Sequence, residues 1–245
     1  MRHTGDRFVE PVPRQRGKPQ TQGPRAPSAH GGIPRKRDPT LTRDRVLRAG
    51  TAEFCRHGYV GARIDKIARR AGCNMRMIYH YFGSKEKLYV AALERVFAEL
   101  RLAESRLALE HLDPVSGVRR LVDFTMTHLG NHPEFIALLG NENLLRGRYL
   151  RKSQVVPRAS GPLLEAIRTL LARGRKAKVF ERDIDALQLY VSILSLCYVH
   201  VSNRYTLSIT FNRDVTDTEW LRARRRHVQE MVLSYLCDTR PAAAA

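Results

Sequence analysis

The spacing of apolar residues after Leu41 is helical almost throughout, and it restricts the chain to an all-α fold. Val46, Ala49 and Phe54 recur on one helix face, and Gly58 is a suitable stop signal. Further helices are predicted over residues 64–71, 75–82, 84–109, 114–131, 133–145, 159–177, 183–203 and 216–237. Residues 204–214 alternate like a strand, but no second strand could pair with them, so we expect an ordered connector.

Positive charge is concentrated in the first third of the chain. The 245 residues hold 43 Lys and Arg against 24 Asp and Glu, a formal net charge of +19. Residues 1–37 contribute +7 and residues 38–90 contribute +6, whereas residues 91–245 together contribute +6. The excess favours an anionic partner, most commonly nucleic acid. A membrane partner is disfavoured, because no run of about 18 apolar residues occurs and no basic helix has a Trp- or Phe-rich face.

A helix-turn-helix pattern occupies residues 64–82. Ile67, Ala68, Ala71 and Ile78 can form a small core between two short helices, with Gly72 in the turn. The second helix starts after a suitable N-cap residue and projects polar side chains away from that core. An α-helix fits the major groove of DNA, where an arginine can donate two hydrogen bonds to a guanine edge. The candidate DNA-contacting residues are Arg63, Asn74, Met75, Arg76, Tyr79, His80 and Lys85.

A solvated basic face is the alternative interpretation of these side chains, because charge runs are usually solvated. The helix-turn-helix frame favours DNA contact, above all for Tyr79 and Lys85, since residues near helix ends commonly position a protein on phosphates. Tyr81 and Phe82 are expected to pack in the core or between domains.

Several spaced elements of this region agree with one known family. They are Val46-Leu47, Phe54, Gly58-Tyr59, Ile64 through Gly72, and Ile78 through Leu88. Together they resemble the tetracycline-repressor (TetR) family of bacterial transcriptional regulators over roughly residues 41–95. His132 to Phe135 and Ser202 to Arg204 resemble the effector domain of some members more weakly. The resemblance implies an all-helical homodimer with an N-terminal DNA-binding domain and a C-terminal domain that binds a small ligand and dimerises.

Two positions depart from the commonest family pattern. Met75-Arg76 stands where many members have a Lys-Gly pair, which affects base preference and not the fold. Arg63 stands where many members have a capping Thr or Ser, so the helix over residues 64–71 is expected to be weakly capped.

These observations divide the chain into four segments. Residues 1–37 hold six of the 12 prolines and five of the 16 glycines, and we expect a disordered basic tail. Residues 38–90 form the helix-turn-helix DNA-binding domain, residues 91–238 form a helical effector-binding and dimerisation domain, and residues 239–245 form a frayed tail.

The second domain offers candidates for two interfaces. A polar cluster within apolar segments could line a ligand pocket with nearby aromatic residues, although core packing is the alternative for each: Phe124, His128, Phe135, Asn141, Glu142, Tyr190 and Tyr198. The segment 186–199 is apolar nearly all round and must be covered on all sides. We therefore expect the last two long helices to form a dimer interface that includes Leu194, Tyr198, Trp220, Val228 and Val232.

No motif for catalysis or metal binding emerges. The four cysteines have no C-x-x-C spacing, and His128 and His132, although four residues apart, precede Pro133, which ends a helix there. A nucleophile elbow, a phosphate-binding glycine loop and an H-E-x-x-H sequence are all missing. We therefore predict no catalytic residues, no metal, no cofactor and no enzymatic activity.

The sequence predicts a repressor that binds a palindromic operator in double-stranded DNA and is released by a small-molecule effector of unknown identity. The expected location is the bacterial cytoplasm, at the nucleoid. A non-specific basic nucleic-acid-binding protein is the first alternative, and a helical enzyme or an interaction scaffold is the second. A footprint on a palindrome would favour the repressor, whereas smooth sequence-independent binding would favour the first alternative.

Deleting residues 1–37 should lower DNA affinity at low salt and matter little at high salt, because a +7 tail binds phosphates without reading bases. The log–log slope against salt should change by about 0.9 per phosphate that the tail neutralises. The measurement is a salt titration of the full-length and truncated proteins on one operator and on random DNA. A changed sequence preference would show instead that the tail reads bases in an adjacent minor groove.

Overall fold

The computed structural model describes residues 39–237, and every regular element in that range is a helix. The first four helices are α1 (Pro39–Gly61), α2 (Ile64–Ala71), α3 (Met75–Phe82) and α4 (Lys85–Ser105). The next are η1 (Leu109–His111), α5 (Pro114–Asn131), α6 (Pro133–Leu144), η2 (Leu150–Lys152), α7 (Val155–Ala159) and α8 (Gly161–Lys176). The last are α9 (Ala186–Ser202), α10 (Arg204–Thr210) and α11 (Thr218–Cys237). The predicted tails, residues 1–37 and 239–245, lie outside the described residues.

Helices α2 and α3 are held by apolar side chains that they bury against α1 and α4. Ile67 of α2, Ile78 of α3 and Phe54 of α1 are fully buried, and Ala68 and Ala71 lie beside them. A helix of eight residues is not stable alone in water, because too few hydrogen bonds offset the cost of nucleation. The small core therefore determines the angle between α2 and α3, as the sequence predicted.

The ends of these helices follow local signals. Gly72 caps α2 in the left-handed conformation, with φ of 64°. Asn74 caps α3 by accepting a hydrogen bond from the amide of Met77 at 3.0 Å, and Ser84 caps α4 by accepting from Lys87 at 3.1 Å. Each side chain satisfies an amide that has no partner inside its own helix.

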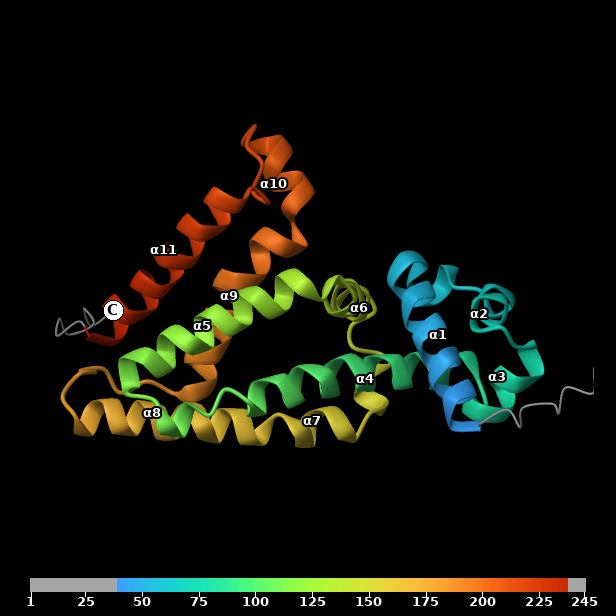
Figure 1. Cartoon of the computed structure of the whole chain (residues 1–245), viewed down its shortest axis with the longest axis horizontal. Helices are drawn as coiled ribbons and strands as arrows, with labels where there is room; N and C mark the ends of the chain where they lie inside the picture. The colour runs from blue at the N-terminus through green and yellow to red at the C-terminus, as the bar shows by residue number, and fades with distance from the viewer. Residues whose placement is uncertain (1–38, 238–245) are drawn as a thin grey trace, which may run out of the picture. The chain divides into compact units, whose positions relative to one another are not determined.

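Helix α4 runs without interruption through the predicted domain boundary at residue 90 (Figure 1). It packs on α1 and α3 near its start and on α6, α7 and α8 further along. The predicted end near Leu109 is wrong, because α4 stops at Ser105. Ala108 takes a positive φ of 49° there, and the chain turns into η1.

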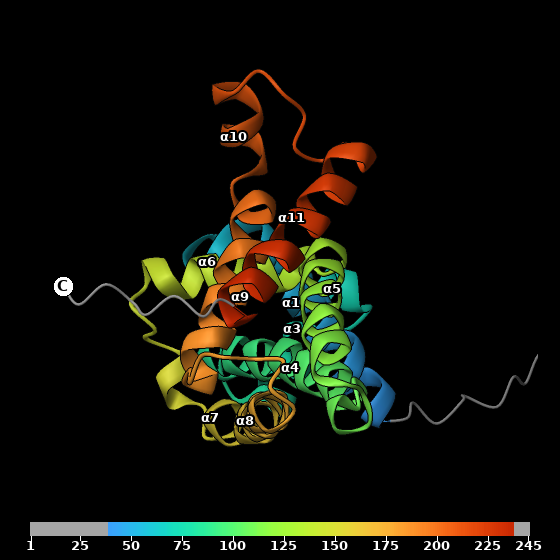
Figure 2. The same ribbon diagram turned by 90° about the vertical axis from the view of Figure 1, so that its left-hand side faces the viewer.

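The remaining helices pack around α5. Helix α5 contacts α8, α9 and α11, and its last residue, Asn131, is separated from α6 only by His132. Figures 1 and 2 show α9 and α11 leading to and from α10, which extends beyond their ends. The core of this part includes Leu121, Leu138, Ile167, Ile193 and Val228, all fully buried.

Two predictions of secondary structure need correction. Residues 204–214, expected to be an ordered connector, include a helix, because Arg204–Thr210 form α10. Without a partner strand, the extended form would leave backbone groups unpaired, whereas the helix satisfies them locally, as in the bond from the Leu207 amide to the Asn203 carbonyl at 2.9 Å. The predicted helix 159–177 corresponds to α8, and the short helix α7, which precedes it and ends before Ser160, was not predicted.

The predicted stop at Gly58 is a kink within α1. Gly58 has φ of 63° and ψ of −177°, a conformation essentially restricted to glycine. A Cβ atom added there would lie 3.0 Å from Oδ1 of Asn141 on α6. The missing side chain therefore permits both the kink and the close approach of α6 to α1.

Gly58→Ala should lower the free energy of unfolding by about 1–3 kcal/mol, because the backbone strain and the contact with Asn141 act together. Gly61→Ala is the matched control: its Cβ would meet only the Cβ of His57 at 3.4 Å, and alanine favours a helix. The measurement is urea unfolding followed by circular dichroism at one protein concentration. Equal losses for the two variants would contradict this account of Gly58.

Candidate nucleic-acid interface and effector domain

One face of α3 presents its side chains to solvent. Met75 and Tyr79 are each 49% exposed, and Asn74, Arg76 and His80 are also exposed. The opposite face buries Ile78 and Phe82. The structure therefore brings five of the seven predicted DNA-contacting residues onto one continuous surface.

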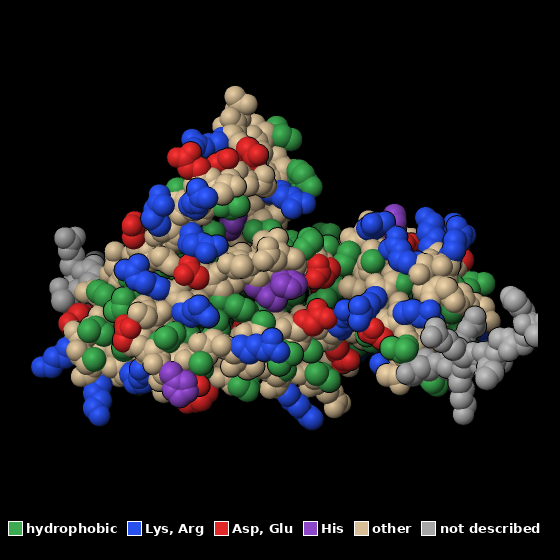
Figure 3. Space-filling model, in the orientation of Figure 1, with side chains coloured by type: hydrophobic (Ala, Val, Ile, Leu, Met, Phe, Trp, Pro, Cys, Tyr) green, Lys and Arg blue, Asp and Glu red, His purple; other side chains and the backbone are tan. Residues whose placement is uncertain are grey.

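Basic side chains are also exposed on the two helices that precede α3. Arg56, Arg63, Lys66, Arg69 and Arg70 are exposed on α1, α2 and the turn between them. Figure 3 shows Lys and Arg side chains gathered over α1 and α2. Such a distribution can attract the phosphates on either side of a DNA groove.

Arg63 and Lys85 differ from the other predicted DNA contacts, because both side chains donate hydrogen bonds within the chain. The Arg63 side chain donates to Asp65 at 3.2 Å and does not cap α2. Lys85 donates to the Val60 carbonyl at 3.3 Å and lies 4.9 Å from the centre of the Tyr59 ring. Burial lowers the pKa of Lys85, and the nearby Glu53 carboxylate opposes that effect. Lys85 therefore joins the start of α4 to the end of α1.

Glu53 is a supporting residue that the sequence analysis did not single out. Its side chain is buried in α1, and its Oε1 accepts a hydrogen bond from the backbone amide of Arg63 at 3.3 Å. This bond supports the start of α2, where Arg63 supplies no cap. An acidic residue four positions before His57 looks like an ordinary exposed helix position in the sequence, so no local signal identified it.

The seven predicted ligand-pocket residues do not line a single cavity. Asn141 and Glu142 lie on α6 near the DNA-binding helices. Glu142 is buried, and its Oε2 accepts from the amides of Tyr149 at 3.1 Å and Leu150 at 2.8 Å. Tyr149 in turn lies 4.2 Å from Tyr59, measured between ring centres. Through these contacts, Glu142 and Tyr149 connect α6 to α1.

Phe124, His128 and Phe135 form a separate group where α5 meets α6. The ring centres of Phe124 and His128 are 5.4 Å apart, and those of His128 and Phe135 are 6.4 Å apart. His128 is buried, not partly exposed, and its ring stacks on His132 at 3.9 Å. Burial, together with His132, lowers the pKa of His128 to about 4, so the ring is neutral at pH 7. Phe124 and His128 line a cavity of about 400 Å³.

Tyr190 lies in a buried polar cluster at another place. Its hydroxyl donates to Glu104 at 3.0 Å, and Arg101 donates to the other oxygen of that carboxylate at 2.5 Å. Burial raises the pKa of Glu104, whereas Arg101 and Tyr190 oppose the rise. Tyr198 is half-buried further along α9.

The predicted dimer residues also separate into two groups. Val228 and Val232 are buried against the chain's own core, so their assignment to an outer surface is corrected. Leu194, Tyr198 and Trp220 remain half-buried, and Trp220 lies 5.7 Å from His200 between ring centres. The broad apolar face of α11 therefore points inward, toward α5.

Residues 39–237 contain neither a candidate membrane span nor a candidate metal site. No helix in that range is both long and apolar enough to cross a membrane. Within the same range, no group of three or more His, Cys, Asp or Glu side chains is arranged to hold a metal ion.

Comparison with known families gives two matches that follow the same division. Residues 46–92 match the family described as bacterial regulatory proteins, tetR family. Residues 114–232 match the family described as tetracyclin repressor-like, C-terminal domain. The first match covers α2 and α3 entirely, and the second extends from the start of α5 into α11.

Curated relatives are named as transcriptional repressors. The HTH-type transcriptional repressor NicS of Pseudomonas putida is 40% identical over 184 residues, which cover 74% of this chain and 87% of that protein. The HTH-type transcriptional repressor SCO4008 of Streptomyces coelicolor is 37% identical over 111 residues, covering 45% of this chain and 54% of that protein.

Solved structures share the fold at low identity. FadR of Bacillus halodurans, a fatty acid degradation regulator, has a TM-score of 0.58 at 20% identity, covering 78% of this chain and 94% of that one. FadR of Bacillus subtilis, solved with stearoyl-CoA, has a TM-score of 0.56 at 16% identity, covering 78% and 98%. With an exposed recognition helix, matches to both family domains and a 40% identical repressor, this chain belongs to the TetR family of transcriptional regulators.

Proposed function

We propose that the protein is a repressor that binds a palindromic operator as a homodimer and leaves it when a small molecule binds the helical domain. The observation that carries this proposal is the exposed face of α3, which is held by a buried core and follows two helices with exposed basic side chains. The names of the curated relatives support repression. The protein would act as a regulator and not as an enzyme, in the bacterial cytoplasm, where it would meet nucleoid DNA.

The exposed side chains would fall into two groups, one that reads bases and one that contacts phosphates. Arg76 can donate two parallel hydrogen bonds to a guanine edge, which would discriminate between bases. Tyr79, His80 and Lys85 would contact phosphates and orient α3 in the groove. Asn74 has a structural role as well, because its side chain caps α3.

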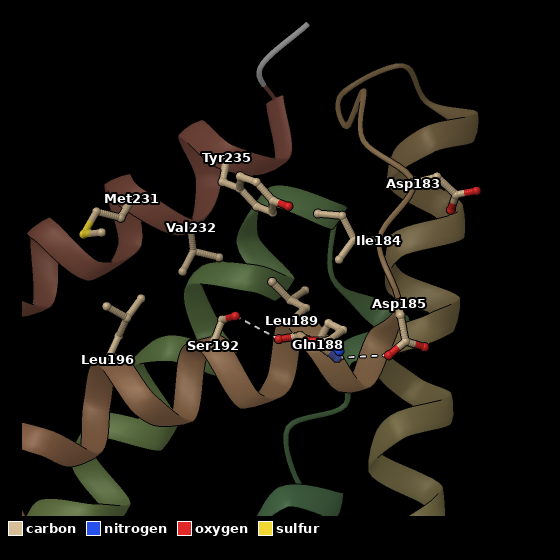
Figure 4. Close-up of a pocket in the computed structure, with 10 residues that line it drawn as sticks. All are labelled: Asp183, Ile184, Asp185, Gln188, Leu189, Ser192, Leu196, Met231, Val232 and Tyr235. Carbon is tan, nitrogen blue, oxygen red and sulfur yellow. Dashed lines mark hydrogen bonds between the residues drawn. The ribbon is translucent and has the colours of Figure 1, made fainter. Parts of the chain in front are cut away.

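A second copy of the chain would cover the outer face of α9. Leu187, Val191 and Val199 are about half exposed on that helix, although the segment is apolar nearly all round. Beside them, a crevice of about 570 Å³ separates α9 from α11, and Figure 4 shows Leu196 pointing toward α11 and Val232 toward α9. Two copies packed through these helices would place two α3 helices on one DNA face, about 34–36 Å apart or a multiple of that spacing.

Effector release requires a connection between the helical domain and α3. Helix α6 is suited to this role, because Asn141 lies against Gly58 and the Cys55 thiol donates to the Glu134 carbonyl at 3.6 Å. A ligand that favours another position of α6 would tilt α1 and change the spacing of the two α3 helices. Couplings of this kind are typically about 1–3 kcal/mol.

Arg76→Ala should weaken binding to the operator by about 1–3 kcal/mol and relax the preference at one base position. Arg119→Ala, an exposed arginine on α5, is the matched control for loss of one positive charge. The measurement is fluorescence anisotropy on an operator selected from genomic fragments with the purified protein, and on random DNA. Equal weakening on both DNAs by Arg76→Ala would remove this residue from base reading.

Val191→Arg should give a folded monomer, because this side chain is 47% exposed in the single chain and would face the second copy. Val60→Arg makes the same substitution at a valine that is 83% exposed on α1, and it should leave the dimer intact. Val232→Arg is unsuitable, since it would place a charge in the chain's own core. Light scattering coupled to size exclusion separates the 28.0 kDa monomer from the dimer. A monomeric wild type at micromolar concentration would contradict the dimer.

A further inference from the structure

A small cavity lies where four helices meet, at the end of the helical domain that carries α10. Its walls come from the last turns of α5 and α9, from the first residue of α10, from residues 215–216 and from α11. Its volume of about 260 Å³ is slightly below the usual range for ligand pockets, so it would suit a molecule smaller than a typical drug. None of the seven ligand-pocket residues predicted from the sequence lines it.

The charged side chains that line this cavity are all arginines. Arg204 and Arg225 reach it from α10 and α11, and no carboxylate is among the lining residues. Arg225 donates to the Thr127 hydroxyl at 3.1 Å, and its nearest carboxylate, Asp123, lies 3.8 Å away. Arg204 has no ion pair within residues 39–237, and its guanidinium donates only to the Tyr205 hydroxyl at 2.8 Å. Of the two arginines, Arg225 therefore forms a long ion pair with Asp123, and the charge of Arg204 has no ion-pair partner among the described residues.

His200 adds an unused hydrogen-bonding atom. The residue is 95% buried, lines the same cavity, and its Nδ1 has no hydrogen-bond partner among the described residues. Burial and the nearby Arg224 lower the pKa of His200 to about 4, so the ring is neutral at pH 7. A buried polar atom without a partner is costly, and the neutral ring adds a polar side chain to the wall that also holds the two arginines.

The other walls are apolar. Met126, Val201, Val215 and Leu221 line the cavity opposite these polar groups. A carboxylate would pair with the two guanidinium groups, which bind planar oxyanions well, while a short hydrocarbon body would contact the apolar side chains.

From this arrangement we propose that the cavity is a binding site for a small monocarboxylate, and that the carboxylate is held by Arg204 and Arg225. The site rests on the proposed function for its regulatory meaning, because occupation would act on DNA binding. Gly130 and Asn131 of α5 form part of the wall, and the next residue, His132, ends α5 and begins α6. Ligand binding would therefore displace His132, the residue between α5 and α6. That displacement would move α6, which contacts Gly58 and α1.

The direct test is calorimetric titration of the full-length protein with acetate, hexanoate and benzoate, and with benzamide as a neutral analogue of benzoate. At least one carboxylate should bind, and benzamide should bind at least about tenfold more weakly than benzoate, because a charge-assisted hydrogen bond is lost. Arg204→Gln and Arg225→Gln should each weaken carboxylate binding by about tenfold or more. Arg213→Gln removes an exposed arginine of the same region that does not line the cavity, and it should bind as the wild type does.

The possible outcomes distinguish failure of the carboxylate site from failure of the proposed repressor function. Absence of binding by all three carboxylates, equal binding of benzamide and benzoate, or an equal loss in Arg213→Gln would overturn the site. Arg204 is partly exposed, so its variant should fold even if Arg225→Gln does not. In the DNA assay, the bound carboxylate should weaken the wild-type operator complex by roughly 5–150-fold and leave the Arg204→Gln complex unchanged.

An operator complex that ignores a bound carboxylate would overturn the regulatory role and leave the repressor assignment intact. Arginine-dependent carboxylate binding by a protein that selects no DNA fragment would support the site and refute the proposed function.

Discussion

The recognition surface depends on the burial of a few apolar side chains by helices that are too short to stand alone. Helices α2 and α3 have eight residues each, and neither could hold its shape in water without α1 and α4. Ile67 and Ile78 are fully buried between them, and each such side chain contributes roughly 1.5–3 kcal/mol. The exposed side chains of α3 lie on the face opposite the buried ones. The same core that stabilises the domain therefore also orients Arg76.

Polar bonds connect this domain to the next one. Glu142 holds the backbone of Tyr149 and Leu150, which places the Tyr149 ring against Tyr59 of α1. This carboxylate is buried, and the two amides bind its Oε2, whereas its Oε1 has no hydrogen-bond partner among the described residues. Gly58 adds a steric requirement, because α6 can approach α1 only where no side chain intervenes. Helices α1 and α6 are thus in direct contact.

Ionisable groups in the helical domain are buried at several separate places. Glu104 is neutralised by Arg101 and hydrogen-bonded by Tyr190, whereas His128 and His200 stay neutral because burial lowers their pKa values. Glu104 has donors on both of its oxygens, but Nδ1 of His200 has no partner within the described residues.

The sequence alone determined the class of fold, the helix-turn-helix and its caps, because these depend on interactions within a few residues. Gly72 donates its amide to carbonyls at the end of α2, and the side chain of Asn74 accepts from an amide at the start of α3, so both signals act within a few residues. Which face of a helix meets which neighbour is a different matter, since it depends on residues far apart in the chain. Only the tertiary structure turned Val228 and Val232 inward, dispersed the predicted pocket and coiled residues 204–210 into a helix. It also brought Arg204 and Arg225 to one cavity, because α10 and α11 converge there on the end of α5.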